Sequence, residues 1–450
     1  MDSPLSRRGF LGTGLKTAAA LGLVGAGATL PNGALERLAS FRPDKKVTTN
    51  LGKEGTITVA LYGNAASNAV AVKAFSKFEQ QTGIKATPVF LNVSSWVEFL
   101  QELETRLAAG VNIDTANIAT EGELLFSSRG ALEPLDSYIA KDHGFVNSFL
   151  ADINPQILAT FKAREDIGGH TYFMPFGYNT MGIWYNRQVF KENSVKEPSA
   201  GWTWDDFLAA SAKLSKSPQK FAMNLTIDVF QGIEPWVFTN GGQVLNSTWT
   251  KCIVDNPAAV EATAFARSLV SKGYAPAPGG QYDQFTELAA GRLAMLGAGA
   301  WPYGYYVDNG GMSDFAIAPW PINKKPGTPF GVGAYCILKS SQNKDAVWEY
   351  IKYTMSDDYQ LNQVLPIQGG LPMKTSIATS REFLSKLPPG ADYFPASLSD
   401  ATFVVGVDNA GAVEGEIDTV WEQILTGNTT PGTGLAQLQA KCNDFMAQKV

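Results

Sequence analysis

Residues 55–62, Gly-Thr-Ile-Thr-Val-Ala-Leu-Tyr, begin a regular alternation of strands and helices that decides the fold class. They alternate β-branched and apolar side chains and end at Gly63-Asn64, so they predict a strand that enters a loop. Residues 70–82 then carry apolar side chains at helical spacing, and Gly83 ends that helix. The alternation continues with a strand at 84–91, a helix at 96–109 and a strand at 114–119. Strands and helices of these lengths predict βαβ units and a largely parallel sheet.

The rest of the chain keeps this rhythm, so we predict an α/β fold. Further strands are expected at 180–186, 291–296, 315–319 and 334–339, and further helices at 204–214, 344–353, 412–425 and 435–446. The chain has 450 residues, which is long for one core and sufficient for two. We therefore expect two doubly wound lobes with a ligand cleft at the carboxyl ends of their strands.

The first thirty residues predict an export signal. Arg7-Arg8 is followed by Gly-Phe-Leu and then by an uncharged run of small and apolar residues from Thr17 to Leu30. The paired arginines resemble a twin-arginine signal, which a receptor reads, and the run is too short to be a comfortable membrane span. We expect a signal at 1–28, a flexible leader at 29–54, and a protein that works in the periplasm or outside the cell.

Composition narrows the classes of partner. The formal net charge is −6 and basic residues form no cluster, which disfavours nucleic acid and anionic membrane. The three cysteines, Cys252, Cys336 and Cys442, have no metal-like spacing. At most one disulfide can form among them, and the sequence does not choose the pair. We expect no metal and no cofactor.

The sequence carries no GxSxG, GxxxxGK[ST] or HExxH motif, and no GxGxxG between a strand and a helix. His143 and His170 are predicted at surface or capping positions, and Asp205-Asp206 at the start of a helix. We therefore expect a binding protein with no catalytic residue. A secreted glycoside hydrolase or lyase that uses a carboxylate pair is the alternative.

Six segments carry a family resemblance: 172–186 (YFMPFGYNTMGIWYN), 202–207 (WTWDDF), 240–242 (NGG), 291–302 (GRLAMLGAGAWP), 331–346 and 369–372 (GGLP). In order and spacing they resemble the extracellular solute-binding proteins of ABC importers, in the carbohydrate-binding branch that includes maltodextrin-binding proteins. The resemblance implies a type II periplasmic-binding-protein-like fold. It also implies that the protein captures a mono- or oligosaccharide and delivers it to the transmembrane permease of an ABC transporter. We expect it to act as a monomer.

The resemblance further implies that both lobes are discontinuous. Crossover hinge segments are expected near 175–179, 305–309 and 358–366. Lobe 1 then comprises residues 55–175 and 310–360, and lobe 2 comprises residues 176–309 and 361–450.

A sugar site needs flat aromatic rings for the C–H faces and polar side chains for the hydroxyl groups. The resemblance places a stacking aromatic at Trp301 and polar hinge contacts at Tyr178 and Asn179. Strand-end loops, the region before Gly241-Gly242, a glycine that admits ligand to the backbone, and the last loop before the C-terminal helices supply the remaining candidates. These are Asn64, Thr120, Glu121, Gln231, Trp236, Gly333, Asp408 and Asn409. The other candidate tryptophans, Trp184, Trp204, Trp348 and Trp421, are predicted to be core residues.

A phosphorylated ligand such as a glycerol phosphodiester or glycerol 3-phosphate, or another polar solute, is the alternative within the same fold. Phosphate recognition favours bidentate cations or a glycine-rich helix start. Arg292 is the one basic residue near the candidate site, and it is predicted within a strand. A neutral sugar is therefore favoured.

Overall fold

The computed structural model describes residues 55–448 except 64, 94, 160–168, 280–281 and 405. The predicted signal, the leader and Asn64 lie outside the described residues. The strands are β1 Thr56–Tyr62, β2 Lys85–Leu91, β3 Thr115–Ala119, β4 Phe173–Thr180, β5 Gly182–Asn186, β6 Phe221–Asn224, β7 Leu293–Ala298, β8 Phe315–Ala318, β9 Thr328–Cys336, β10 Leu371–Pro372 and β11 Ala401–Phe403.

The helices cover both sheets. They are α2 Ala65–Thr82, α3 Trp96–Ala108, α4 Thr120–Ser128, α5 Asp136–Lys141, α6 His143–Ala151, α8 Arg187–Glu192, α9 Trp204–Leu214, α10 Glu234–Thr239, α11 Pro257–Ser271, α12 Gln284–Ala289, α13 Pro302–Asp308, α14 Lys344–Thr354, α15 Asp357–Asn362, α16 Val364–Gln368, α17 Thr375–Ala378, α18 Arg381–Leu384, α19 Tyr393–Ala396, α20 Ala410–Thr426 and α21 Pro431–Ala447. A π-helical turn, η1, spans Val229–Ile233, and a 3-10 turn, η2, spans Ser397–Asp400. Within the described residues, no helix combines the length and the apolar character that a membrane span requires.

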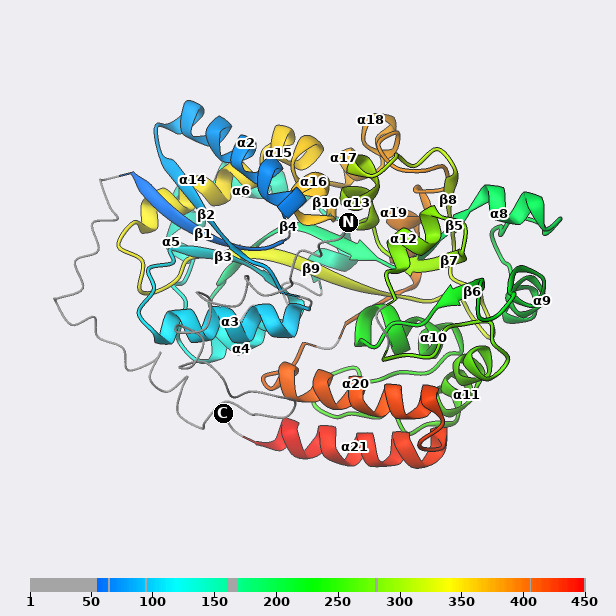
Figure 1. The fold of residues 1–450 in the computed structure, drawn as a ribbon. Coiled ribbons are helices and arrows are strands. Elements are labelled where there is room, and N and C mark those ends of the chain that lie inside the picture. Colours follow the sequence, from blue (N-terminus) through cyan, green and yellow to red (C-terminus); the bar gives the residue numbers. More distant parts are fainter. Residues whose placement is uncertain are drawn as a thin grey trace, which may run out of the picture.

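Two sheets form the framework (Figure 1). The larger sheet has the order β10-β4-β9-β3-β1-β2, with β11 paired to β9, and the smaller sheet has the order β6-β7-β5-β8. The α/β fold class is confirmed. The prediction of a largely parallel sheet holds for β1 with β2 and β3. It is wrong for β9, which is antiparallel to β3 and β4, for β10, which is antiparallel to β4, and for β5, which is antiparallel to β7 and β8.

Strand pairing also differs from the predicted division of the chain. β4 lies wholly in the larger sheet, β8 pairs with β5 in the smaller one, and β10 and β11 belong to the larger one. The chain therefore passes between the sheets at Met181, between residues 318 and 328, and after residue 403. The predicted crossings near 305–309 and 358–366 are displaced, because these segments form α13 and α15–α16.

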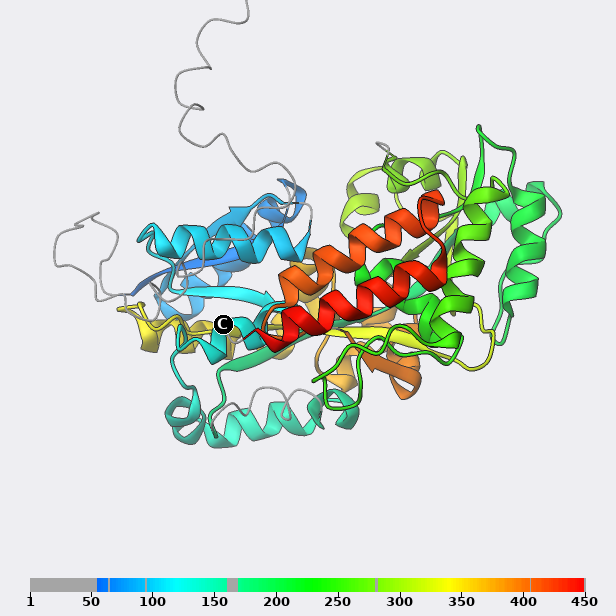
Figure 2. The same cartoon turned by 90° about the horizontal axis from the view of Figure 1, so that it is seen from below.

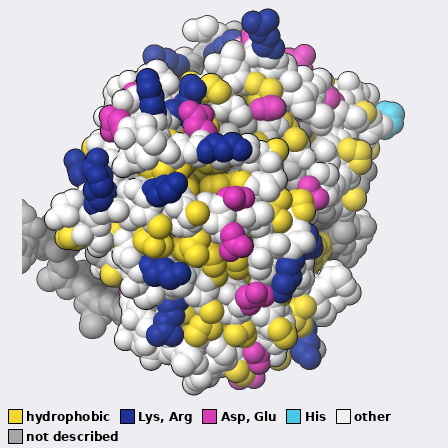
Figure 3. All heavy atoms as spheres, turned by 90° about the vertical axis from the view of Figure 1, so that its right-hand side faces the viewer, with side chains coloured by type: hydrophobic (Ala, Val, Ile, Leu, Met, Phe, Trp, Pro, Cys, Tyr) yellow, Lys and Arg dark blue, Asp and Glu magenta, His cyan; other side chains and the backbone are white. Residues whose placement is uncertain are grey.

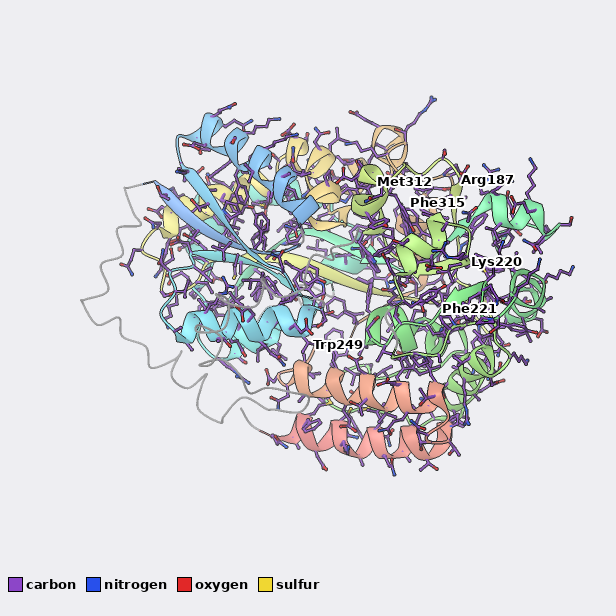
Figure 4. The ribbon with its side chains drawn as sticks, viewed as in Figure 1. Arg187, Lys220, Phe221, Trp249, Met312 and Phe315 are labelled. Carbon is purple, nitrogen blue, oxygen red and sulfur yellow. The ribbon has the colours of Figure 1, made fainter. Side chains whose placement is uncertain are left out.

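The last two helices support the smaller sheet. α20 and α21 lie side by side and reach from the helices of that sheet towards α3 and α4 (Figure 2). On α20, Val413, Ile417 and Trp421 are buried at helical spacing. Trp249 contacts the apolar cores of both sheets and lies 5.7 Å, ring to ring, from Phe403 of β11 (Figure 4).

Several predictions about single residues are confirmed. Trp184, Trp204, Trp348 and Trp421 are at most 4% exposed. His143 and His170 are exposed. Asp206 caps α9, where its backbone N–H donates to the Thr203 hydroxyl at 3.1 Å and its carboxylate accepts from the Thr203 N–H at 2.9 Å.

The three cysteines are free and buried. Their positions reduce the possible disulfides to one. The thiols of Cys252 and Cys442 lie within hydrogen-bond contact, whereas Cys336 is in β9 of the larger sheet. Asn443 holds the same two segments together, since its side chain accepts from Cys252 N–H at 2.9 Å and donates to Cys252 C=O at 3.0 Å.

The hydroxyl of Thr328 joins two passages of the chain between the sheets. Thr328 Oγ1 accepts from Met181 N–H at 2.8 Å and donates to Met181 C=O at 3.0 Å, with both residues fully buried. Thr328→Val should lower the free energy of unfolding by about 2–4 kcal/mol, because two buried backbone groups lose their partner. Thr328→Ser keeps the hydroxyl and should cost less than about 1 kcal/mol. Urea denaturation measures both, and equal losses would show that the methyl group matters instead.

Candidate ligand-binding site

One aromatic pair stands at the end of the larger sheet. Tyr62, the last residue of β1, stacks on Trp96, the first residue of α3, with ring centroids 4.6 Å apart and planes 22° apart. The Ser95 side chain accepts from Glu98 N–H at 3.2 Å, which caps α3 and fixes where Trp96 emerges. Both rings are partly exposed, so they can offer a flat face.

A second aromatic pair belongs to the smaller sheet. Phe230 in η1 and Trp301, directly before α13, have ring centroids 6.2 Å apart. Trp301 fits closely over two glycines: a Cβ at Gly299 would lie 2.5 Å from its Cζ3, and one at Gly369 would lie 2.7 Å from its Cβ. Larger residues at these positions would displace the indole, so the glycines set the position of Trp301.

The two pairs face one region. A Cβ at Gly331 of β9 would lie 3.6 Å from Phe230 Cε2 and 3.7 Å from Thr120 Oγ1, so η1, β9 and the start of α4 converge there. Asp228, two residues before Phe230, acts electrostatically on Tyr62 of the other pair. We take the space between these elements as the candidate site.

Side-chain amides connect the elements around this space. Asn179 of β4 accepts from Ala300 N–H at 3.0 Å and donates to Gly369 C=O at 3.2 Å, which holds the loop before Trp301 against β4. On the first side, Asn117 accepts from Tyr62 N–H at 3.1 Å and donates to Gln368 Oε1 at 2.5 Å. These amides position the backbone around both aromatic pairs.

Gln231 anchors η1 to the smaller sheet. Its side-chain amide donates to Gly297 C=O of β7 at 2.7 Å and lies 3.5 Å from Gln284 Oε1. Gln284 also accepts from Asn224 at the end of β6 at 3.0 Å. This polar group lies where strands of the smaller sheet end, as expected for an α/β ligand site.

Carboxylates flank the same space. Asp228 caps η1, Glu121 lies in the first turn of α4, and Glu414 and Asp418 lie one turn apart on α20. Burial, and to a smaller extent the nearby Asp228, raise the pKa of Asp418 to about 8. Burial also raises the pKa of Glu414 well above its usual value, with Glu121 and Asp418 adding to the effect.

Comparison with known proteins identifies this architecture. The family profile of bacterial extracellular solute-binding proteins matches residues 73–388. The chain belongs to this family. It is 22% identical over 366 residues to a binding protein of Brucella abortus, which covers 79% of this chain and 84% of that protein. It is 25% identical over 309 residues to the maltotriose-binding protein of Pyrococcus abyssi, over 67% of this chain and 63% of that one.

Solved structures share the fold of this solute-binding protein. An ABC substrate-binding protein of Listeria monocytogenes in complex with cycloalternan has a TM-score of 0.78 at 22% identity, over 88% of this chain and 100% of that chain. The GacH receptor of Streptomyces glaucescens, studied unliganded and with acarbose, has a TM-score of 0.74 at 22% identity, over 89% and 100%. A solute-binding protein of Thermotoga lettingae bound with α-D-tagatose has a TM-score of 0.74 at 21% identity, over 87% and 100%.

The structure brings several predicted site residues of this solute-binding protein together. Glu121, Asn179, Gln231 and Trp301 lie around the candidate site through the contacts above. Thr120 is near it, but its hydroxyl is committed to β9, accepting from Val332 N–H at 2.9 Å. Their contact with a ligand stays a prediction.

Other predicted residues lie elsewhere or serve packing. Trp236 is fully buried against Trp204 and Trp320. This position contradicts the predicted contact between Trp236 and a ligand. Tyr178 is 4% exposed and packs in the core of the larger sheet. A Cβ at Gly333 would lie 2.6 Å from Phe176, so this glycine accommodates a protein ring instead of a ligand.

The last two predicted residues, Asn409 and Asp408, contact other parts of the protein. The Asn409 side chain donates to Phe445 C=O at 2.7 Å, which ties the loop before α20 to the end of α21. Asp408 is exposed, and its charge acts on Arg129 at the end of α4. We withdraw Asn409 and Asp408 from the candidate site.

Sequence reasoning missed Tyr62, Trp96, Phe230, Asp228 and Gln284. Tyr62 carried a usable signal, because it ends the first strand, where α/β sites form. Trp96 and Phe230 carried none, since an aromatic residue at a helix start is more often packed in the core.

A cavity of about 300 Å³ lies between the 195–202 segment and α9, apart from the candidate site. It lies at the outer end of the smaller sheet, on the face where Lys, Arg, Asp and Glu side chains are interspersed (Figure 3). Trp202 lines it but is 7% exposed, so the cavity offers little aromatic surface and we do not assign the ligand to it.

The carboxylates predict how stability depends on pH. The pKa of Asp418 is about 8 in the folded chain and near 3.8 in the unfolded chain, so between these values the folded state binds the extra proton. The free energy of unfolding should therefore fall as pH rises from about 4 to 8. Glu414, facing Glu121, Asp228 and Glu234, acts in the same direction.

Asp418→Asn should flatten this dependence in the ligand-free protein, and the matched change of exposed Asp444 on α21 should not. Urea midpoints measured at several pH values test this. A midpoint that rises with pH over this window would contradict the burial of these carboxylates.

Proposed function

We propose that this protein is the substrate-binding component of an ABC importer, which captures a sugar outside the cytoplasm and delivers it to a membrane permease. The observation that carries the proposal is the placement of two aromatic pairs, Tyr62–Trp96 and Phe230–Trp301, around one space bordered by carboxylates and amides. Stacked rings suit the C–H faces of a sugar, and carboxylate and amide oxygens accept from its hydroxyl groups.

The comparisons support this proposal, because related proteins of the family are described with maltotriose, cycloalternan, acarbose and tagatose. Asp228, Glu414 and Asp418 argue against a phosphorylated ligand, since these acidic side chains offer no cation to pair with a phosphate. The proposed export signal at residues 1–28 fits an extracellular role. The two sheets with their helices would form lobes that close over the sugar, acting as a monomer.

A binding panel tests the function. Calorimetry with maltotriose, cellobiose, tagatose and glycerol 3-phosphate should show binding of at least one saccharide and none of the phosphate. A ligand at about 100 times its Kd should stabilise the fold by about 2.7 kcal/mol, which a thermal shift detects. Chromatography of the same mixtures should show no product, and turnover of any saccharide would establish an enzyme instead.

Trp301 should be the main stacking platform. Trp301→Ala should weaken saccharide binding at least about tenfold, or about 1.4 kcal/mol, because it removes an aromatic face from the site. The unfolding midpoint should change little, since Trp301 is only partly buried. Phe145, which is 43% exposed on α6, supplies the control: Phe145→Ala should leave affinity unchanged. A large loss of stability with unchanged affinity would make Trp301 a core residue.

A further inference from the structure

α20 presents two acidic side chains to the candidate site. Glu414, Asp418 and Trp421 follow one another at helical spacing, and Trp421 donates its indole N–H to Thr226 C=O at 2.9 Å. This stripe therefore faces the segment that leads into η1, where Asp228 lies. The charged groups that act on Glu414 are Glu121, Asp418, Glu234 and Asp228, all of them carboxylates.

Glu414 is buried, and one of its two carboxylate oxygens has no partner in the described part of the protein. The residue is 8% exposed, and its Oε1 has no hydrogen-bond partner among the described residues. Asp418 Oδ1 is likewise buried and has no hydrogen-bond partner among the described residues. Burying a carboxylate without a donor or an opposite charge is costly, so these oxygens require a partner that the helix does not supply.

The side of α20 that faces α21 differs in its charge balance. Glu416, which lies between the two residues in sequence, forms an ion pair with Lys441 of α21 at 2.6 Å. Among the described residues, no ion pair includes Asp228, Glu414 or Asp418. The chain therefore pairs the acid that faces α21 with a cation and leaves the acids beside the site without one.

A metal ion is a poor fit to these acids. Within the described part of the chain, no group of three or more His, Cys, Asp or Glu is arranged to hold one. An organic ammonium group is a better fit, because it takes hydrogen-bond acceptors over a wider range of geometry. Two aromatic rings also attract a cation to their faces: Tyr62, on which Asp228 acts electrostatically, and Phe230, two residues after Asp228.

We propose that the ligand is an amino-substituted saccharide, whose ammonium group is bound by Asp228, Glu414 and Asp418 while its rings stack on the aromatic pairs. This inference rests on the proposed sugar-binding function and specifies its substrate class. The acidic groups select the protonated amine over its neutral or acylated forms. Asp228 and Asp418 are partly exposed, so the ammonium group reaches them first and then compensates Glu414.

The experiment compares three disaccharides with the same linkage: β-1,4-linked diglucosamine, its N,N′-diacetyl form and cellobiose. Calorimetry near pH 7 should give at least about tenfold tighter binding of the free amine, as expected for a charge-assisted contact. The same titration in buffers of different ionisation enthalpy should show proton release, because the carboxylates must ionise to bind the cation.

Variants separate the charge from the fold. Glu414→Gln combined with Asp418→Asn should reduce affinity for diglucosamine at least about tenfold and change affinity for neutral sugars by less than about twofold. Glu416→Gln, on the side of the same helix that faces α21, should change neither. Because both site changes replace acids whose ionisation destabilises the fold, the variant should fold at least as well as the parent, and an unfolding curve checks this.

The outcomes are distinguishable. Equal or tighter binding of cellobiose or the diacetyl sugar would overturn the amino-saccharide inference and leave the sugar-binding function standing. Binding of spermidine but of no saccharide would overturn both. A thermal shift with calcium alone that Glu414→Gln abolishes would show a metal site and overturn the inference.

Discussion

The hydroxyl of Thr328 holds together the first two passages of the chain between the sheets. Met181 is the single residue between β4 and β5, and Thr328 is the first residue of β9 after the chain returns from β8. One side chain therefore pairs with both backbone groups of the residue at which the sheets separate. Thr180 continues the arrangement, since its hydroxyl donates to Phe394 C=O at 3.1 Å and accepts from Ser397 at 3.0 Å.

The candidate site depends on this junction. β9 enters the larger sheet at Thr328 and reaches Gly331 three residues later, where Phe230 and the start of α4 meet it. β4 carries Asn179 one residue before Thr180, and Asn179 holds the loop that presents Trp301. The residues that join the sheets are thus next to the residues that shape the site. A change in the angle between the sheets would alter the distance between the two aromatic pairs.

Local sequence patterns predicted where helices and strands lie better than they predicted which strands pair with one another. The strand at 114–119 and the helices at 204–214 and 412–425 are present within a few residues, because apolar periodicity and capping residues are local. The sheet to which β8 or β11 belongs depends on long-range pairing that no local pattern records. Asn179, Gln231 and Trp301 were predicted near the site. Trp236 was wrongly placed there, because a tryptophan before a glycine pair looks the same whether it faces a ligand or Trp204 and Trp320.

The acids of α20 show why a site can be hidden in a regular sequence pattern. Glu414, Glu416 and Asp418 alternate with the apolar residues of an amphipathic helix, which is typical of a solvated face. Only the packing of α20 against η1 and α4 separates them, burying Glu414 and leaving Glu416 with Lys441. That burial raises the free energy of the unliganded protein, and a cationic ligand would recover it on binding. Part of the affinity would then come from charges that the fold holds without a partner, a contribution that neither the aromatic rings nor the side-chain amides can supply.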